Sequence, residues 1–448
     1  MFRPNSTQLA VDPILKGSYV DDISGGADSI DQLNTIAQQL NSMCASACLP
    51  LDKWKSNTQE FIIPSTSQSK DKSSLHTFDE SLSKVLGLSW SSTHDQFTFQ
   101  SSISESAVIT KRSILSEVAQ LFDPLGLISP VVIQAKIQQL WLEKLDWDDQ
   151  LCPDTVNQWT KFREDISKLT KLRIPRWINL QSNSYSIQLH GFSDASQLAM
   201  AAVVYLRITD HTGNSKVTLV CSKTRVAPIK RLTIPRLELS AAVLLAQLIR
   251  HTQSTLELQN NPVFLWTDSS VTLAWIKNNP MKWKEYVGNR VEAIHQATPN
   301  AIWRFTSGKL NPEDCASRGL NASQLIHHPL WWTGPPWLTQ SPEYWPTSVA
   351  PSPTEELEER PSISLTVIPQ PDVWDLINLP CVKTFHKDLN KLLRITALCQ
   401  RAISCFKRTP NSNVLTSPIG PADLEKAKLF WIKTTQQAYF SSESTPSR

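Results

Sequence analysis

The stretch HGFSDASQLAMAAVVYL, residues 190–206, decides the fold. It places one carboxylate, Asp194, between two apolar runs and surrounds it with small residues. The alternation before Asp194 and the apolar run after it predict two strands that meet at a turn. One interpretation makes Asp194 a polar turn residue. The other makes it a metal ligand at the rim of a sheet, which requires more carboxylates elsewhere in the chain.

The neighbouring sequence predicts a mixed sheet flanked by helices. Period-2 alternation and β-branched residues mark the strands, and apolar residues at helical spacing mark the helices. We expect strands at 185–196, 198–208, 216–226, 262–268 and 301–307, and helices at 234–253, 269–278, 283–296 and from 311 onward. Strands that alternate with helices in this order are typical of an α/β fold.

Four carboxylates stand at the ends of these predicted elements. Asp194 ends the first strand, Glu238 lies in the first turns of the long helix, Asp268 ends the fourth strand and Asp314 opens the last helix. Such a cluster is unfavourable unless cations balance it. We expect two Mg²⁺ ions, with Mn²⁺ as the alternative metal, held about 3.5–4 Å apart for hydrolysis of a phosphodiester.

Each carboxylate also has a simpler interpretation. Asp194 fits a turn, Glu238 fits a solvated helix face and Asp268 fits the N-cap of the next helix. Asp314 has a competitor in the adjacent Glu313. The joint order of the four residues and the elements around them favour a shared site.

Residues 184–322 resemble the RNase H fold of reverse-transcribing elements. The segments HGFSDAS (190–196), TIPRLELSAA (233–242), WTDSSVTLAWI (266–276) and NPEDCASRGL (311–320) resemble BEL/Pao-type LTR retrotransposon polyproteins. The resemblance implies an RNase H-type hydrolase that cleaves the RNA strand of an RNA–DNA hybrid. It also implies that Asp194, Glu238, Asp268 and Asp314 are the catalytic metal ligands.

The resemblance extends over most of the chain. YVDD at 19–22 resembles the palm hairpin of reverse transcriptases, which would make Asp21 and Asp22 metal ligands. LDKWKSN (51–57), TKRSILSEVAQLFDPLGLISPV (110–131) and LDWDD (145–149) resemble the stretch between palm and RNase H, and HPLWWTGPPWL (328–338) resembles the region leading to integrase. The rest of the palm is not expected here, so DNA synthesis is not expected either.

Composition shifts mark the boundaries of five regions, and the resemblance implies their identities. They are a partial palm at 1–52, a thumb or connection region at 53–183, the RNase H-like domain at 184–322, a Pro/Trp-rich linker at 323–370 and a helical region at 371–448. The expected partners are an RNA–DNA hybrid or other nucleic acid, and the upstream palm and downstream integrase of the same polyprotein.

Recognition of a hybrid requires donors near the metals and cations along a groove. The side chains predicted to contact nucleic acid are polar or basic and lie beside the four carboxylates or in the two flanking basic stretches: Ser196, Ser269, Ser270, Lys223, Arg225, Arg236, Lys282 and Lys284. Solvated helix and loop positions are the alternative interpretation of each.

The composition excludes several other classes. The 448 residues carry a net charge of +3 and eight cysteines, with no C-x-x-C pair, no glycine-rich phosphate loop and no apolar run long enough for a membrane span. The expected location is the cytoplasm, with the nucleus or virus-like particles as alternatives. The rival functions are a catalytically inert nucleic-acid-binding remnant, an integrase relative, which the early Glu238 argues against, and, last, a serine hydrolase.

Overall fold

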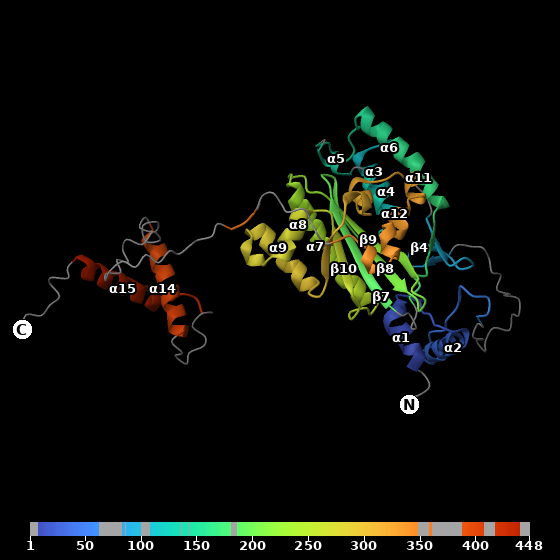
Figure 1. Cartoon of the computed structure of the whole chain (residues 1–448), viewed down its shortest axis with the longest axis horizontal. Helices are drawn as coiled ribbons and strands as arrows, with labels where there is room; N and C mark the ends of the chain where they lie inside the picture. The colour runs from blue at the N-terminus through green and yellow to red at the C-terminus, as the bar shows by residue number, and fades with distance from the viewer. Residues whose placement is uncertain are drawn as a thin grey trace, which may run out of the picture. The chain divides into compact units, whose positions relative to one another are not determined.

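The computed structural model describes residues 8–61, 83–85, 87–99, 108–135, 137–142, 144–180, 186–347, 358–360, 388–406 and 417–439. The chain divides into two compact units, Met1–Pro361 and Ser362–Arg448. The first unit contains the predicted mixed sheet, and Figure 1 shows that helices cover both of its faces.

A five-stranded sheet lies at the centre of the first unit. Its strands are β7 (Ser186–Ala195), β8 (Ala199–Thr209), β9 (Ser215–Val226), β10 (Val263–Thr267) and β11 (Ile302–Phe305), in the order β11-β10-β7-β8-β9. The first three strands form an antiparallel meander. Strand β10 pairs with β7 in parallel, and β11 pairs with β10 in parallel. The predicted order of strands and helices is confirmed, and so is the mixed α/β class.

One face of the sheet is covered by helices that follow it directly in the chain. These helices are α7 (Ile234–Thr255), α8 (Ser270–Lys277) and α9 (Glu285–Ala297). Their buried side chains, such as Leu245, Ile249 and Val291, pack on Leu189 and Leu265 of the strands. As the sequence predicts, α7 begins with a proline in its first turn, where a missing N–H costs nothing.

Segments distant in the chain cover the opposite face (Figure 1). They include α4 (Ser129–Ile133), α10 (Asp314–Arg318), α11 (Ala322–Ile326) and α12 (Pro329–Thr333), followed by the short 3-10 helices Pro336–Thr339 and Pro342–Tyr344. Trp331, Trp337 and Trp345 are buried there against Phe192 and Trp266 of the sheet. The part of the predicted linker from 323 to 345 is therefore core of this unit rather than a connection.

Part of the region upstream of the sheet belongs to this core through residues such as Ile128 and Ile166, whereas Ile114, Leu140 and Trp159 form a separate cluster. The upstream region holds α3 (Lys111–Ala119), α5 (Ile137–Leu142), α6 (Pro153–Ile166) and an antiparallel sheet of β3 (Ser83–Val85), β4 (Leu88–Ser91), β5 (Gln96–Thr98) and β6 (Arg173–Pro175). Gly126 has a φ of 72° and a Cβ there would lie 2.0 Å from the carbonyl oxygen of Ser222 on β9. This close approach fixes the 123–128 loop on the sheet, so the predicted boundary near residue 184 does not separate two cores.

The N-terminal part is a small helical cluster with a hairpin. Helices α1 (Gln8–Gly17) and α2 (Ile30–Ser46) come before and after a hairpin of β1 (Ser18–Tyr19) and β2 (Asp22–Ile23), which pair antiparallel and are mostly exposed. The YVDD stretch therefore forms a hairpin, and Ser29 caps α2 by accepting a hydrogen bond from the Gln32 N–H. The assignment of this hairpin to a polymerase palm stays a prediction.

The second unit contains two long helices, α14 (Leu389–Phe406) and α15 (Pro421–Tyr439), among its described residues. Arg401 of α14 is bonded to Asp423 of α15 at 2.6 Å, and the Trp431 indole donates to Thr396 Oγ1 at 2.8 Å. The two amphipathic helices predicted near the C-terminus are therefore formed and packed together.

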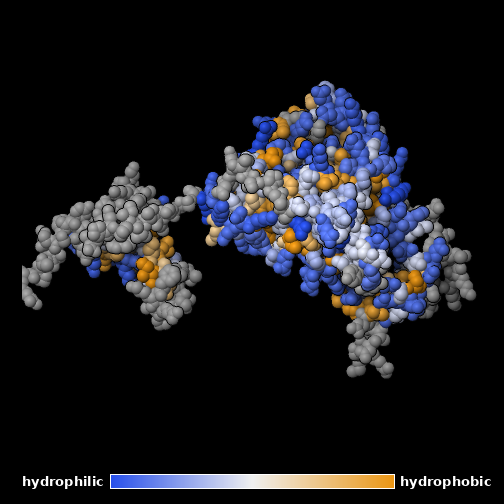
Figure 2. Space-filling view, in the orientation of Figure 1, coloured by the Kyte–Doolittle hydropathy of each residue, from blue (hydrophilic) through white to orange (hydrophobic). Residues whose placement is uncertain are grey.

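Figure 2 shows a mostly hydrophilic surface with an apolar patch over α1 and α2. Leu15 of α1 is 76% exposed. Within the described part of the chain, no helix combines the length and the apolar character that a bilayer crossing requires.

Candidate functional site

Two of the predicted carboxylates lie at the same end of adjacent parallel strands. In the pairing of β10 with β7, Thr267 is opposite Ser193, so the next residues on each strand, Asp268 and Asp194, come side by side at the strand ends. Carboxyl ends of parallel strands meet at one edge of a sheet, which is where α/β proteins bind ligands. The topology therefore places this pair where the sequence analysis expected a site.

Asp194 is almost fully buried, with 6% of its surface exposed. Its Oδ2 accepts a hydrogen bond of 2.5 Å from the Ser317 hydroxyl of α10. Burial raises the pKa of Asp194, and the nearby Asp314 carboxylate raises it further, while the Ser317 hydrogen bond opposes the shift.

Asp268 is the most strongly affected of the four. Burial raises its pKa to about 7, and the charges of Asp194 and Glu238 act in the same direction. A hydrogen bond from the Asn311 amide, 3.3 Å from Oδ1, lowers the pKa only in part. Each unit of this rise in pKa makes the ionised carboxylate about 1.4 kcal/mol less stable relative to its protonated form. The neighbouring side chains do not offset this with a compensating cation.

Glu238 and Asp314 complete the group from two helices. Burial and the charge of Asp194 raise the pKa of Glu238, which interacts with Ser269 at the start of α8. Asp314 is the first residue of α10 and forms an ion pair with Arg318 at 2.5 Å. It is linked electrostatically to Asp194 rather than to the other two.

The four carboxylates therefore form one electrostatic cluster centred on Asp194. Their hard oxygen donors, and the raised pKa values of Asp194, Glu238 and Asp268, suit Mg²⁺, which prefers carboxylate and water ligands. As the side chains stand, however, no group of three or more His, Cys, Asp or Glu in the described residues is arranged to hold a metal ion. Arg318 pairs with Asp314 instead, so coordination by Asp314 requires its carboxylate to turn.

Sequence analysis missed the residues that support the cluster. Asn311 is fully buried and donates through its amide to both Asp268 and the Ser193 carbonyl, at 3.3 and 3.1 Å. Ser317 lies three residues after Asp314 and so faces the same side of α10. Hydroxyl and amide groups spaced around an acidic residue at a helix start are the signal that could have indicated both.

Glu313, the alternative to Asp314 as a ligand in the sequence analysis, is buried at the start of α10. It is 0% exposed and neither of its carboxyl oxygens has a hydrogen-bond partner in the described structure. Burial and the charge of Asp194 hold its pKa well above its usual range, so it is a neutral acid beneath the cluster.

The serines predicted to contact nucleic acid are engaged within the protein. Ser196 donates to the Ser317 carbonyl at 2.6 Å, and Ser269 caps α8 by accepting from the Thr272 N–H. Ser270 is the first residue of α8. These contacts fix the backbone around Asp194 and Asp268, so the first two hydroxyls have a structural role in the free protein.

The predicted cations divide into two groups. Lys223 and Arg225 are exposed near the end of β9, while Arg236, Lys282 and Lys284 lie close to α9. We use the name basic surface for Arg236, Lys282, Lys284 and Arg290. Its centre is the Tyr286 ring, with the Arg236 and Arg290 guanidinium carbons 4.8 and 3.5 Å from the ring centroid.

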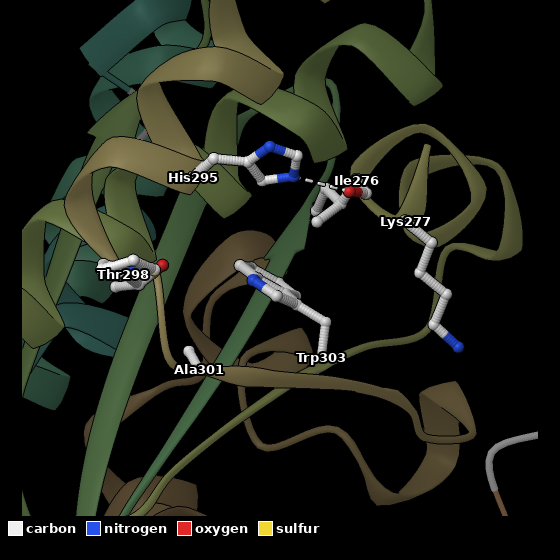
Figure 3. A pocket seen from close by; sticks show the side chains of 7 residues that line it. Ile276, Lys277, His295, Thr298, Ala301 and Trp303 are labelled. Carbon is white, nitrogen blue, oxygen red and sulfur yellow. Dashed lines mark hydrogen bonds between the residues drawn. The ribbon is translucent and has the colours of Figure 1, made fainter. Parts of the chain in front are cut away.

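A separate cavity of about 250 Å³ lies near the edge strand β11. Figure 3 shows His295 and Trp303 in its lining, with the imidazole bonded to the Ile276 carbonyl at 2.7 Å. None of the four clustered carboxylates lines this cavity. It is therefore not part of the candidate site.

The strand order and connections define a protein of the RNase H-like class. Residues 110–269 match the family described as Pao retrotransposon-like RNaseH-like domain. The predicted resemblance to BEL/Pao-type elements is confirmed over this segment. The match begins at 110 rather than near 184, in agreement with the shared core described above.

No curated protein sequence matches the chain. Among solved structures, a foamy viral protease-reverse transcriptase in complex with ds DNA is similar over 50% of this chain and 38% of its own, at 13% identity and a TM-score of 0.32. RNase H1 from Halobacterium salinarum NRC-1 is similar over 27% and 87%, at 14% identity and a TM-score of 0.18. The chain thus spans less than half of the foamy viral chain. Sequence identities and TM-scores as low as these two carry no functional argument.

Proposed function

We propose that the chain is a retrotransposon-derived RNase H that hydrolyses the RNA strand of an RNA–DNA hybrid at the Asp194 cluster. The observation that supports it is the raised pKa of Asp268, about 7, produced by burial beside Asp194 and Glu238. Buried like charges of this kind favour binding of divalent cations. Two bound Mg²⁺ ions would supply an activated water and stabilise the leaving oxygen.

The protein's own groups have distinct tasks in this proposal. Asp194, Glu238, Asp268 and Asp314 would hold the metals. Asn311, whose amide is also bonded to the Ser193 carbonyl of β7, orients Asp268. Ser317 orients Asp194, because each of the two residues donates a hydrogen bond to a carboxylate oxygen. The basic surface would bind the nucleic-acid backbone through its cations.

Cleavage of a labelled hybrid tests this proposal. We expect the full chain to cut the RNA strand with Mg²⁺ and to leave single-stranded RNA and duplex DNA intact. The Asp268→Asn variant keeps the shape of the side chain and removes its charge, so it should not cleave. Equal rates for the two proteins would show that the activity comes from elsewhere.

The second candidate is a nucleic-acid-binding remnant without turnover. The ion pair of Asp314 with Arg318, which directs one expected ligand away from the cluster, favours it. It predicts hybrid binding by both proteins and no Mg²⁺-dependent cleavage by either. DNA synthesis is not part of either proposal, and nothing in the described hairpin at 18–23 brings a third carboxylate to Asp21 and Asp22.

A further inference from the structure

A short acidic segment of the chain lies on the basic surface. The Lys284 N–H donates to the Glu358 carbonyl at 2.8 Å, and the Arg360 N–H donates to the Lys282 carbonyl at 2.9 Å. Glu359 and Trp283 between them form an antiparallel bridge. Residues 358–360 thus pair with the 282–284 segment through an isolated antiparallel bridge and its two flanking backbone hydrogen bonds.

The side chains of this segment pair with cations of the same surface. The Glu358 carboxylate accepts from Arg236 Nε at 2.8 Å, and its side chain is only 17% exposed. The Glu359 carboxylate lies 3.3 Å from Lys282 Nζ. Two of the four cations of the basic surface are therefore matched by carboxylates of one tripeptide.

These carboxylates pair with two cations that the proposed function assigns to backbone phosphates. Arginine and lysine bind carboxylates and phosphates through the same charge-assisted hydrogen bonds. Arg236 lies in the first turn of α7, two residues before Glu238. Glu358 also has a φ of 77°, a backbone conformation that residues with a Cβ rarely adopt, so its partners rather than local preference hold it there.

We propose that Glu358–Arg360 is an intramolecular ligand of the basic surface and competes with nucleic acid for it. This inference rests on the proposed function, because the competitor is the hybrid backbone. Release of the segment would free Arg236 and Lys282 for phosphates. While the segment stays bound, the chain would bind a hybrid more weakly than it would with Arg236 and Lys282 free.

The test compares the full chain with its Glu358→Gln/Glu359→Gln variant. Hybrid binding is measured by fluorescence anisotropy in EDTA, so that hydrolysis does not interfere. We expect the variant to bind about fivefold more tightly at low ionic strength, and the difference to shrink as salt screens the ion pairs. The matched control, Glu60→Gln/Glu343→Gln, removes the same charge from two exposed positions outside the contact and should bind like the original chain.

Hydrogen exchange of the Arg360 amide gives a second, independent readout. The amide should be protected in the free chain, and it should exchange faster in the double variant and when hybrid is added. Equal affinities of variant and original chain, or continued protection of Arg360 in the complex, would overturn the competition and leave the proposed function intact. Absence of hybrid binding by every variant would contradict the proposed function, and with it the competition.

Discussion

Two groups of aspartates in this chain differ in everything except residue type. Asp21 and Asp22 lie on an exposed hairpin of two-residue strands. Asp194 and Asp268 lie at the ends of longer parallel strands, where burial and neighbouring carboxylates raise the pKa of both. Water screens the charges of the first pair, whereas hydrogen bonds offset the burial and mutual repulsion of the second pair only in part.

The difference shows that a motif acquires chemistry from its surroundings. Adjacent carboxylates on a solvated turn cost the fold little, so their presence says little about function. Buried carboxylates that repel one another reduce stability, and a fold keeps such an arrangement where a cation or reaction uses it. Each prediction below either breaks this contrast or sharpens it.

The largest effect is expected at Asp194, because its charge acts on Glu238, Asp268 and Glu313 alike. Asp194→Asn should lower hybrid cleavage by more than about 100-fold, since loss of even a supporting residue of a metal site costs 10–100-fold. It should also bring the pKa of Asp268 below about 7. Initial rates and carboxyl titration by NMR measure the two effects, and an unchanged rate would break the contrast.

Stability should depend on pH in a direction set by the same cluster. The pKa of Asp268 is about 7 in the folded chain against a reference of 3.8, so the folded state binds more protons between these values. The free energy of unfolding of the metal-free protein should therefore fall as the pH rises from about 4 to about 7. Thermal unfolding with EDTA at several pH values measures this contribution.

Mg²⁺ should reverse this loss, because it binds the ionised carboxylates of the folded state. The increase in Tm on adding Mg²⁺ should be larger at pH 8 than at pH 5, by several degrees if the difference is ~1–2 kcal/mol. Asp268→Asn removes the titrating group, and its pH dependence should be flatter. An Mg²⁺ effect equal at both pH values would contradict a metal site made of these carboxylates.

A smaller effect is expected at Ser317, which positions Asp194 without touching substrate. Ser317→Ala should lower cleavage by about tenfold and weaken the apparent Mg²⁺ affinity. Its hydrogen bond lowers the pKa of Asp194, so its loss should move the acidic limb of the rate–pH profile to higher pH. A drop in rate with an unmoved profile would indicate a structural role only.

The two faces of the sheet show how much of the fold the sequence could predict. The face under α7, α8 and α9 is built from residues 234–297, next to the strands in the chain, and local periodicity was enough. The opposite face is covered by residues such as Ile128, Ile166, Trp331 and Trp345, which are far apart in the chain. No local pattern states which distant segment will pack on a strand.

The Trp-rich segment shows a second reason. Its prolines resemble those of a linker, yet they stand in the first turns of α12 and of the 3-10 helices at 336–339 and 342–344, where proline favours a helix start. The tryptophans then fill the space over Trp266, with ring centroids of Trp266 and Trp337 4.5 Å apart. Composition alone could not separate the two outcomes.

For the site, the order of the four carboxylates predicts one cluster, because strand ends and helix starts meet at one edge of a sheet, and their role as metal ligands stays a prediction. The supporting groups were not predictable in the same way. Asn311 reaches Asp268 from a separate loop, and Ser317 reaches Asp194 across more than a hundred residues of sequence. Only the packing of α10 against β7 brings them together.

The smallest effect is expected at the exposed pair. Asp21→Asn/Asp22→Asn removes two charges from a solvated hairpin, and exposed substitutions away from buried networks change stability by less than about 0.5 kcal/mol. Hybrid cleavage and Tm should therefore equal those of the original chain. The matched variant is Asp194→Asn/Asp268→Asn, which removes the same charge from the buried cluster. If the hairpin variant lost cleavage as the cluster variant does, exposure would not distinguish the two groups, and the hairpin would belong to the active site.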